Sequence, residues 1–151
     1  MKYLRILFLS NAASIHTVRW VNALAERGHE VHLVYKSDDT PTDNKISEQV
    51  IHHRLKYAGT KGYFLNALQL RKVTKEIKPD IVNAHYASGY GTLVRLANLR
   101  PLLLSVWGSD VYEFPYQSKL KMKLLVDNLK YANSIASTSE SMANQVKKLL
   151  E

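Results

Sequence analysis

The sequence contains no cysteine. This absence excludes a disulfide scaffold and any metal site with thiolate ligands, and it fits a reducing compartment. No apolar run approaches the roughly 20 residues that a helix needs to span a bilayer. The apolar run at residues 3–10 leads directly into a charged segment without a clean cleavage site, so it indicates a buried strand rather than a signal peptide.

Two phosphate-binding motifs are also missing. A dinucleotide-binding fold carries G-x-G-x-x-G after its first strand, because the backbone there must approach a pyrophosphate closely. Residues 11–16 instead read NAASIH, without glycine, and the chain has no P-loop. The sequence therefore argues against NAD or ATP binding of the usual kinds.

The bulk composition is that of one globular domain, with 151 residues of which 46% are hydrophobic and 23% charged. The formal net charge of +8 favours anionic partners such as phosphates or acidic lipid surfaces, although solvated helix faces explain it equally well. No recognition module or basic, aromatic sheet face is evident, so we expect no nucleic-acid partner.

Apolar runs of strand length alternate with segments of helical periodicity along most of the chain. The predicted strands cover residues 3–10, 30–35, 49–57, 81–84, 102–106 and 134–136. A first helix is capped by Ser14 and ended by Gly28, further helices cover residues 63–77, 91–99, 118–132 and 140–150, and loops are expected at 36–48 and 58–62. We therefore predict an α/β fold with a doubly wound, mostly parallel, Rossmann-like sheet of about six strands.

The strand order predicts where a ligand binds. In the common order 3-2-1-4-5-6 the sheet reverses between the first and fourth strands, and ligands bind beyond the strand ends at that point. Residues 11–16 then face residues 85–91, with residues 107–110 alongside. His85 is a candidate base or hydroxyl ligand, although a lone strand-end histidine is more often structural. Asp110 either accepts a hydrogen bond from a sugar hydroxyl or caps the following turn.

Other residues around this crevice also have two interpretations. The turn at residues 88–91 either holds an anion or sugar hydroxyls at a helix N-terminus, or is only a tight strand-to-helix turn. Arg19 is placed to reach a phosphate, whereas Trp20 is predicted to lie in the core. The adjacent His52 and His53 point to opposite sides of a strand, which argues against a metal site there.

The predicted helix at residues 118–132 carries a second apolar stripe opposite its core face. The stripe consists of Leu120, Leu124 and Tyr131, flanked by Lys119, Lys121, Lys123 and Lys130. An apolar strip edged with lysines suits docking at an anionic membrane surface. Packing under a neighbouring loop or a further domain explains the stripe as well. The alternative to an enzyme is accordingly a non-catalytic module that binds a membrane surface or another anion.

Several short segments together suggest a family. They are residues 7–16, 26–31 (ERGHEV), 79–86 (PDIVNAHY), Gly89, 107–111 (WGSDV) and 137–140 (STSE). In this order and spacing, over essentially all of the chain, they resemble the N-terminal half of a GT-B glycosyltransferase of family 4 (group 1).

The resemblance implies that residues 1–151 form an acceptor-binding domain, and that a C-terminal domain absent from this chain binds a nucleotide-sugar such as a UDP- or GDP-sugar. It also implies retaining transfer of a hexosyl group without a metal ion or other cofactor. The implied acceptor is a glycan or a lipid-linked saccharide, in the synthesis of capsular polysaccharide, exopolysaccharide or lipopolysaccharide. The implied location is the cytoplasm, or the inner face of the cell membrane as a peripheral protein.

Together with the crevice geometry, the resemblance makes His85 and Asp110 the candidate catalytic residues, because the role of the family histidine replaced by Trp107 is either absent or moved to one of them. The residues implied in substrate binding are His16, Arg19, Tyr86, Ser88, Gly89, Tyr90, Gly91, Trp107, Gly108, Ser109, Ser139 and Glu140. Three features depart from the family pattern. The glycine-rich turn after the first strand is missing, and Trp107 stands where a histidine often precedes the Gly-x-Asp element. The paired glutamates of the second domain are not in this chain, so the isolated domain is expected to be catalytically incomplete.

Overall fold

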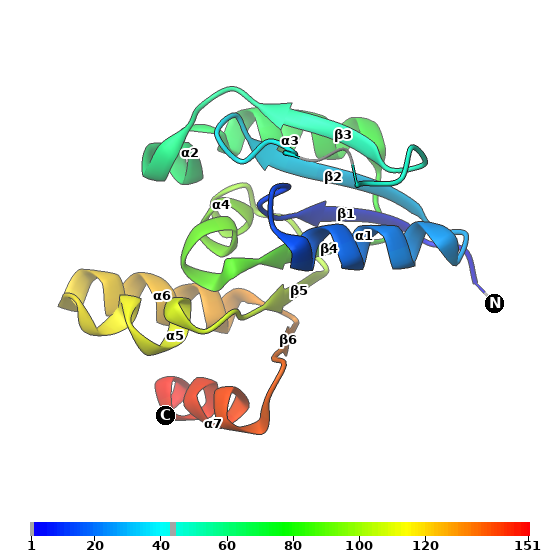
Figure 1. Ribbon diagram of the computed structural model, residues 1–151. Coiled ribbons are helices and arrows are strands. Elements are labelled where there is room, and N and C mark those ends of the chain that lie inside the picture. The colour runs from blue at the N-terminus through cyan, green and yellow to red at the C-terminus, as the bar shows by residue number, and fades with distance from the viewer. Residues whose placement is uncertain (1, 43–44) are drawn as a thin grey trace.

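The computed structural model describes residues 2–42 and 45–151, and within these ranges six strands form one sheet (Figure 1). The strands are β1 (Arg5–Leu9), β2 (Glu30–Lys36), β3 (Ile51–Leu55), β4 (Ile81–His85), β5 (Leu102–Ser105) and β6 (Ser134–Ala136). All neighbouring pairs are parallel, in the order β3-β2-β1-β4-β5-β6. The predicted strand order is therefore confirmed, and the sheet reverses between β1 and β4.

Helices follow most strands and cover both faces of the sheet, as Figure 1 shows. They are α1 (Ile15–Glu26), α2 (Gly59–Leu65), α3 (Ala67–Ile77), α4 (Gly91–Leu96), α5 (Ser109–Tyr112), α6 (Lys119–Tyr131) and α7 (Glu140–Leu150). A π-helical turn, η1 (Tyr86–Tyr90), precedes α4, and a 3-10 turn, η2 (Phe114–Tyr116), precedes α6. Among the described residues, no helix is both long and apolar enough to cross a membrane.

The alternation of side chains along β1 divides the core in two. Phe8 packs with α1 residues such as Val21 on one face of the sheet. Leu7 and Leu9 join the larger cluster on the other face, to which α3, α4, α6 and α7 contribute. Successive strand residues point to opposite faces, so a strand that is apolar throughout must be covered on both sides. The sequence of β1 thus explains why the sheet is doubly wound.

Several predicted boundaries shift in the structure. The helix predicted at 63–77 is two helices, and the loop predicted at 58–62 is wrong because α2 already begins at Gly59. The break lies at Asn66, a buried residue whose side-chain amide donates to the Tyr57 carbonyl oxygen (2.8 Å) and accepts from the Tyr57 N–H (3.0 Å). This long-range pair of bonds overrides the continuous helical pattern. The strand predicted at 49–57 is shorter, and residues 43 and 44 of the loop predicted at 36–48 lie outside the described residues.

The predicted caps are correct. The Ser14 hydroxyl accepts from the His16 N–H at the start of α1, and Gly28 has a φ of 91° after its end. At the start of α7 the Ser139 hydroxyl accepts from the Met142 N–H. These local signals therefore set where α1 and α7 lie relative to the strand ends.

Candidate functional site

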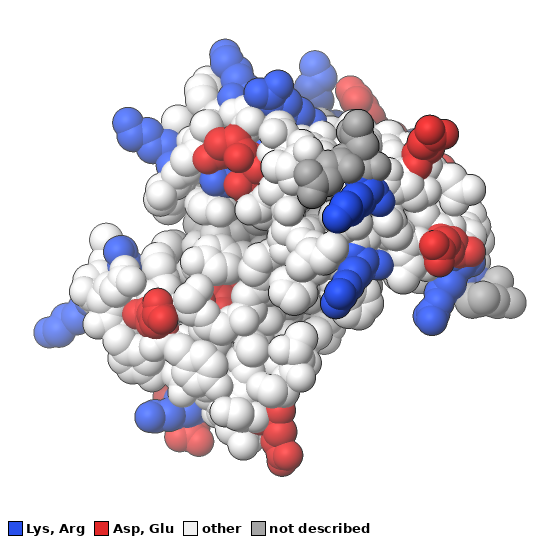
Figure 2. Space-filling model, viewed as in Figure 1, with Lys and Arg blue, Asp and Glu red and all other residues white. Residues whose placement is uncertain are grey.

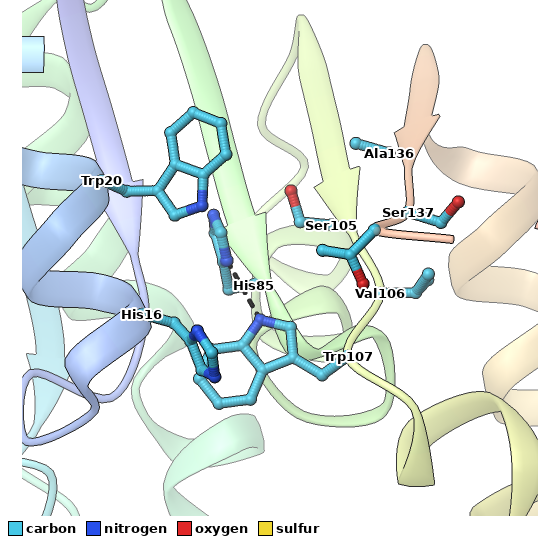
Figure 3. A pocket seen from close by; sticks show the side chains of 9 residues that line it. His16, Trp20, His85, Ser105, Val106, Trp107, Ala136 and Ser137 are labelled. Atoms are coloured by element: carbon cyan, nitrogen blue, oxygen red, sulfur yellow. Dashed lines mark hydrogen bonds between the residues drawn. The ribbon is translucent and has the colours of Figure 1, made fainter. Parts of the chain in front are cut away.

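A cavity of about 190 Å³ lies where β4, β5 and β6 end beside the start of α1 (Figure 3). Its walls come from four separate segments of the chain. The lining residues are His16, Trp20, His85, Ser105, Val106, Trp107, Ala136, Ser137 and Thr138. The cavity thus occupies the crevice that the strand order predicts.

Each of the three segments predicted to meet here, residues 11–16, 85–91 and 107–110, contributes an aromatic ring to the cavity. Trp107 lies edge-on to His16 and to His85, with ring centroids 6.0 and 6.1 Å apart. Trp20 lies 6.5 Å from His85, also edge-on. The prediction that Trp20 belongs to the core is wrong, because 53% of its surface is exposed and it forms a wall of the cavity. Its place on α1, one turn beyond His16, turns the indole toward the strand ends rather than under the helix.

The hydrogen bonds of His85 define its tautomer. The indole Nε1–H of Trp107 donates to His85 Nδ1 at 3.0 Å, so Nδ1 carries no proton. His85 Nε2 lies 3.0 Å from Asn83 Oδ1, which can only accept, so Nε2 carries the proton. Asn83 is itself oriented, because its amide nitrogen donates to the Leu103 carbonyl oxygen and the Ser105 hydroxyl. Both nitrogens of His85 are thus occupied within the protein.

Burial keeps His85 neutral. Its ring packs on Phe8 with centroids 4.5 Å apart, and only 4% of the residue is exposed. Burial, with the nearby His16 adding to it, lowers the pKa of His85 from its ordinary 6.5 to about 4. A neutral imidazole is the form that a base requires, but here its basic nitrogen already holds the Trp107 indole. The catalytic role of His85 stays a prediction.

Asp110 is fully buried and does not line the cavity. One oxygen accepts from the Ala87 N–H at 2.7 Å, and the other accepts from the N–H groups of Trp107 and Gly108 at 3.0 and 2.8 Å. The carboxylate therefore ties the loop after β5 to η1. This geometry supports the capping alternative for Asp110, and a catalytic role stays a prediction.

The turn at residues 88–91 is also buried. Gly89 packs against the Tyr63 ring, and the Tyr90 hydroxyl donates to Asp39 and accepts from the Lys36 N–H. None of these residues lines the cavity. Of the two interpretations, this arrangement supports a tight strand-to-helix turn rather than an anion-binding site. Tyr86, at the start of η1, has a φ of 75°, and its ring lies 6.1 Å from that of Trp107.

The remaining predicted binding residues lie around the cavity rather than in it. Arg19, Ser109 and Glu140 are exposed, Gly108 has a φ of 139°, and Ser139 caps α7. Sequence reasoning missed the other lining residues, which are Ser105, Val106, Ala136, Ser137 and Thr138. Only their position in the sequence could have predicted them, since each lies at the end of β5 or β6 or directly after it.

No group of three or more His, Asp or Glu side chains capable of holding a metal ion occurs among the described residues. The adjacent histidines of β3 diverge as predicted. His52 bonds the Tyr35 hydroxyl, and His53 bonds His32, on the other face of the sheet.

A comparison with protein families identifies the chain. Residues 5–139 match the family described as "Glycosyl transferase 4-like". The chain belongs to this family. The predicted α/β fold and its assignment to the N-terminal half of the GT-B architecture are thereby confirmed. No curated protein matches the sequence of this glycosyl transferase 4-like domain significantly.

Solved structures share the fold at low sequence identity. Sucrose-phosphate synthase from Thermosynechococcus elongatus is 13% identical with a TM-score of 0.72, over 97% of this chain and 45% of its own. Glycyrrhiza uralensis UGT73P12, complexed with glycyrrhetinic acid 3-O-monoglucuronide, is 12% identical with a TM-score of 0.65, over 99% and 47%. Phytolacca americana UGT2, complexed with UDP-2fluoro-glucose and pterostilbene, is 13% identical with a TM-score of 0.56, over 89% and 48%. The glycosyl transferase 4-like domain thus spans under half the length of each.

Proposed function

We propose that this domain is the acceptor-binding half of a retaining glycosyltransferase, which transfers a hexosyl group from a UDP- or GDP-sugar to a glycan or lipid-linked acceptor. The observation that carries the proposal is the cavity at the ends of β4, β5 and β6, in a chain of the glycosyl transferase 4-like family. A C-terminal domain supplies the nucleotide-sugar site, and no metal or cofactor takes part. The product belongs to capsular polysaccharide, exopolysaccharide or lipopolysaccharide, made in the cytoplasm at the inner face of the membrane.

The test is sugar transfer by the complete protein that contains residues 1–151. His85→Ala should lower kcat/KM by about 10²-fold, because the cavity wall and the Trp107 indole lose their support. His52→Ala, on the opposite edge of the sheet, is the matched control and should leave transfer unchanged. NMR of the new anomeric centre reports whether configuration is retained. No transfer from any UDP- or GDP-sugar would refute the proposal.

A second candidate function, docking at an anionic membrane, has one specific observation in its favour. Leu120 at the start of α6 is 78% exposed, and Lys119, Lys121 and Lys123 beside it are exposed as well. Tyr131 does not belong to the predicted stripe, because its hydroxyl donates to the Leu99 carbonyl oxygen and its ring packs under Arg100. The stripe is thereby reduced to Leu120 and the half-buried Leu124.

Sedimentation with phosphatidylserine vesicles tests this second function. We expect salt-sensitive binding that Leu120→Glu abolishes. The control is Leu68→Glu on α3. Leu68 is 80% exposed, so it presents about as much apolar surface to water as Leu120 does. Binding that both variants retain, or no binding by the unchanged domain, would exclude membrane docking through α6.

A further inference from the structure

The cavity has no fixed charge in a strongly charged protein. The chain carries 21 Lys and Arg and 13 Asp and Glu residues, yet none of the described lining residues is one of them. Figure 2 shows Lys, Arg, Asp and Glu side chains distributed over this face, with uncharged surface between them. His85, which forms the floor, is neutral and buried. Apart from the imidazole of His16, a phosphate or carboxylate that entered would meet no side chain able to offer it a positive charge, so its loss of water would be costly.

One wall of the cavity is an open aromatic surface. Trp20 is half exposed, and its indole N–H makes no hydrogen bond with the described residues. The face of an aromatic ring is electron-rich, so it attracts the weakly positive C–H edges of an apolar ligand surface. Trp107 differs, because it is less exposed and its ring is surrounded by those of His16, His85 and Tyr86. Trp20 is thus the side chain placed to receive a ring.

Two of the polar groups that line the cavity are serine hydroxyls that can form further hydrogen bonds. The Ser105 hydroxyl accepts from Asn83, so its own O–H remains to donate. The Ser137 hydroxyl donates to the Ser139 carbonyl oxygen, so its oxygen remains to accept. A spare donor at the end of β5 and a spare acceptor just after β6 match a polyol, in which each hydroxyl both donates and accepts.

The volume of the cavity is suited to a single sugar ring. A cavity of about 190 Å³ is smaller than the roughly 300–1,000 Å³ of sites that enclose a drug-sized molecule. We infer that the cavity binds one uncharged sugar residue of the acceptor, with its apolar face stacked on Trp20 and its hydroxyls directed toward Ser105 and Ser137. The inference rests on the proposed function, which supplies a saccharide as the acceptor.

Sugar binding at Trp20 can be followed by NMR, because the chain contains two tryptophans. The chain contains no others, so a ¹H–¹⁵N spectrum of this domain holds two indole signals, which Trp20→Phe and Trp107→Phe assign. The probes are neutral methyl glycosides of glucose, galactose, mannose and fucose, with methyl glucuronide and glucose 1-phosphate as anions at equal ionic strength. At least one neutral glycoside should shift the Trp20 signal, and the anions should bind at least tenfold more weakly. Trp20→Ala should lose this binding, whereas Leu68→Ala on α3 should keep it.

Three results would overturn the inference: no shift with any neutral glycoside, anions that bind equally well, or binding that survives Trp20→Ala. The proposed function fails separately. If the complete protein transfers sugar but Trp20→Ala does so normally, only the sugar subsite is wrong. If neutral glycosides bind at Trp20 and no transfer occurs, only the glycosyltransferase proposal is wrong.

Discussion

The indole Nε1–H of Trp107 donates a hydrogen bond to Nδ1 of His85, with 3.0 Å between the two nitrogens. Trp107 stands where the family often has a histidine, and His85 is one of the two histidines that the strand order brings to the crevice. A donor-only indole leaves His85 one tautomer, with its proton on Nε2 facing Asn83. Trp107 therefore positions His85 as well as forming part of the cavity wall.

Trp107→Phe should remove this positioning while it keeps an aromatic ring in place. His85 Nδ1 would lose its donor, and the free energy of unfolding should fall by about 1 kcal/mol in urea denaturation. Long-range ¹H–¹⁵N spectra should show a single Nε2–H tautomer for His85 in the unchanged domain. Trp20→Phe is the control, since the Trp20 indole makes no hydrogen bond with the described residues, and an equal loss of stability in both variants would contradict the positioning role.

The stability of the domain should depend on pH through His85. Its pKa is about 4 in the folded state and 6.5 ordinarily, so the unfolded chain takes up the proton first as the pH falls. The stabilisation is complete above pH 6.5 and is lost between about pH 6.5 and 4, by roughly 3 kcal/mol. Urea denaturation at pH 7.5 and 4.5 measures the loss. The non-titrating His85→Gln should show a smaller loss, and an unchanged pH dependence would contradict this prediction.

Asp110→Asn should destabilise the domain although it changes only one atom. The new amide nitrogen would face a backbone N–H that now donates to a buried carboxylate oxygen, so we expect a cost of about 2 kcal/mol or more. Asp127→Asn is the control, because Asp127 pairs only with the exposed Lys123, and its unfolding midpoint should not move. Equal stability of Asp110→Asn and the parent would show that the carboxylate does not hold the two loops together.

Gly89→Ala tests the packing behind the site. A Cβ at Gly89 would lie 2.6 Å from Tyr63 Cζ and 2.8 Å from Tyr86 Cδ2, both in rings. Overpacking of this kind costs about 1–3 kcal/mol. At Gly91 the nearest atom is the flexible Leu104 Cδ1 at 3.1 Å, so Gly91→Ala should cost less. Thermal melts of the pair measure the difference, and the reverse ranking would contradict the described packing.

Much of the fold follows from local patterns. The apolar runs of β1, β4 and β5 need cover on both faces, which leaves few arrangements other than a parallel sheet with helices on each side. The hydroxyls of Ser14 and Ser139 cap helices by bonding residues two or three positions away, so their roles are visible in the chain itself. The split between α2 and α3 was not predictable, because the Asn66 side chain reaches back over the whole of α2 to bond the backbone of Tyr57.

The sequence by itself determined the strand order, and with it the crevice at which His16, His85 and Trp107 meet. The strand order follows from the hydrophobic periodicity of short segments and from the right-handedness of strand–helix–strand connections. Neither depends on the exact position of any one side chain. Only the tertiary structure decided that Trp20 forms a wall of the cavity and that the buried Asp110 carboxylate links two loops by hydrogen bonds. It also decided that no Lys, Arg, Asp or Glu is among the residues described as lining the cavity. These facts depend on side-chain direction and on contacts between residues distant in the chain, which no local pattern encodes.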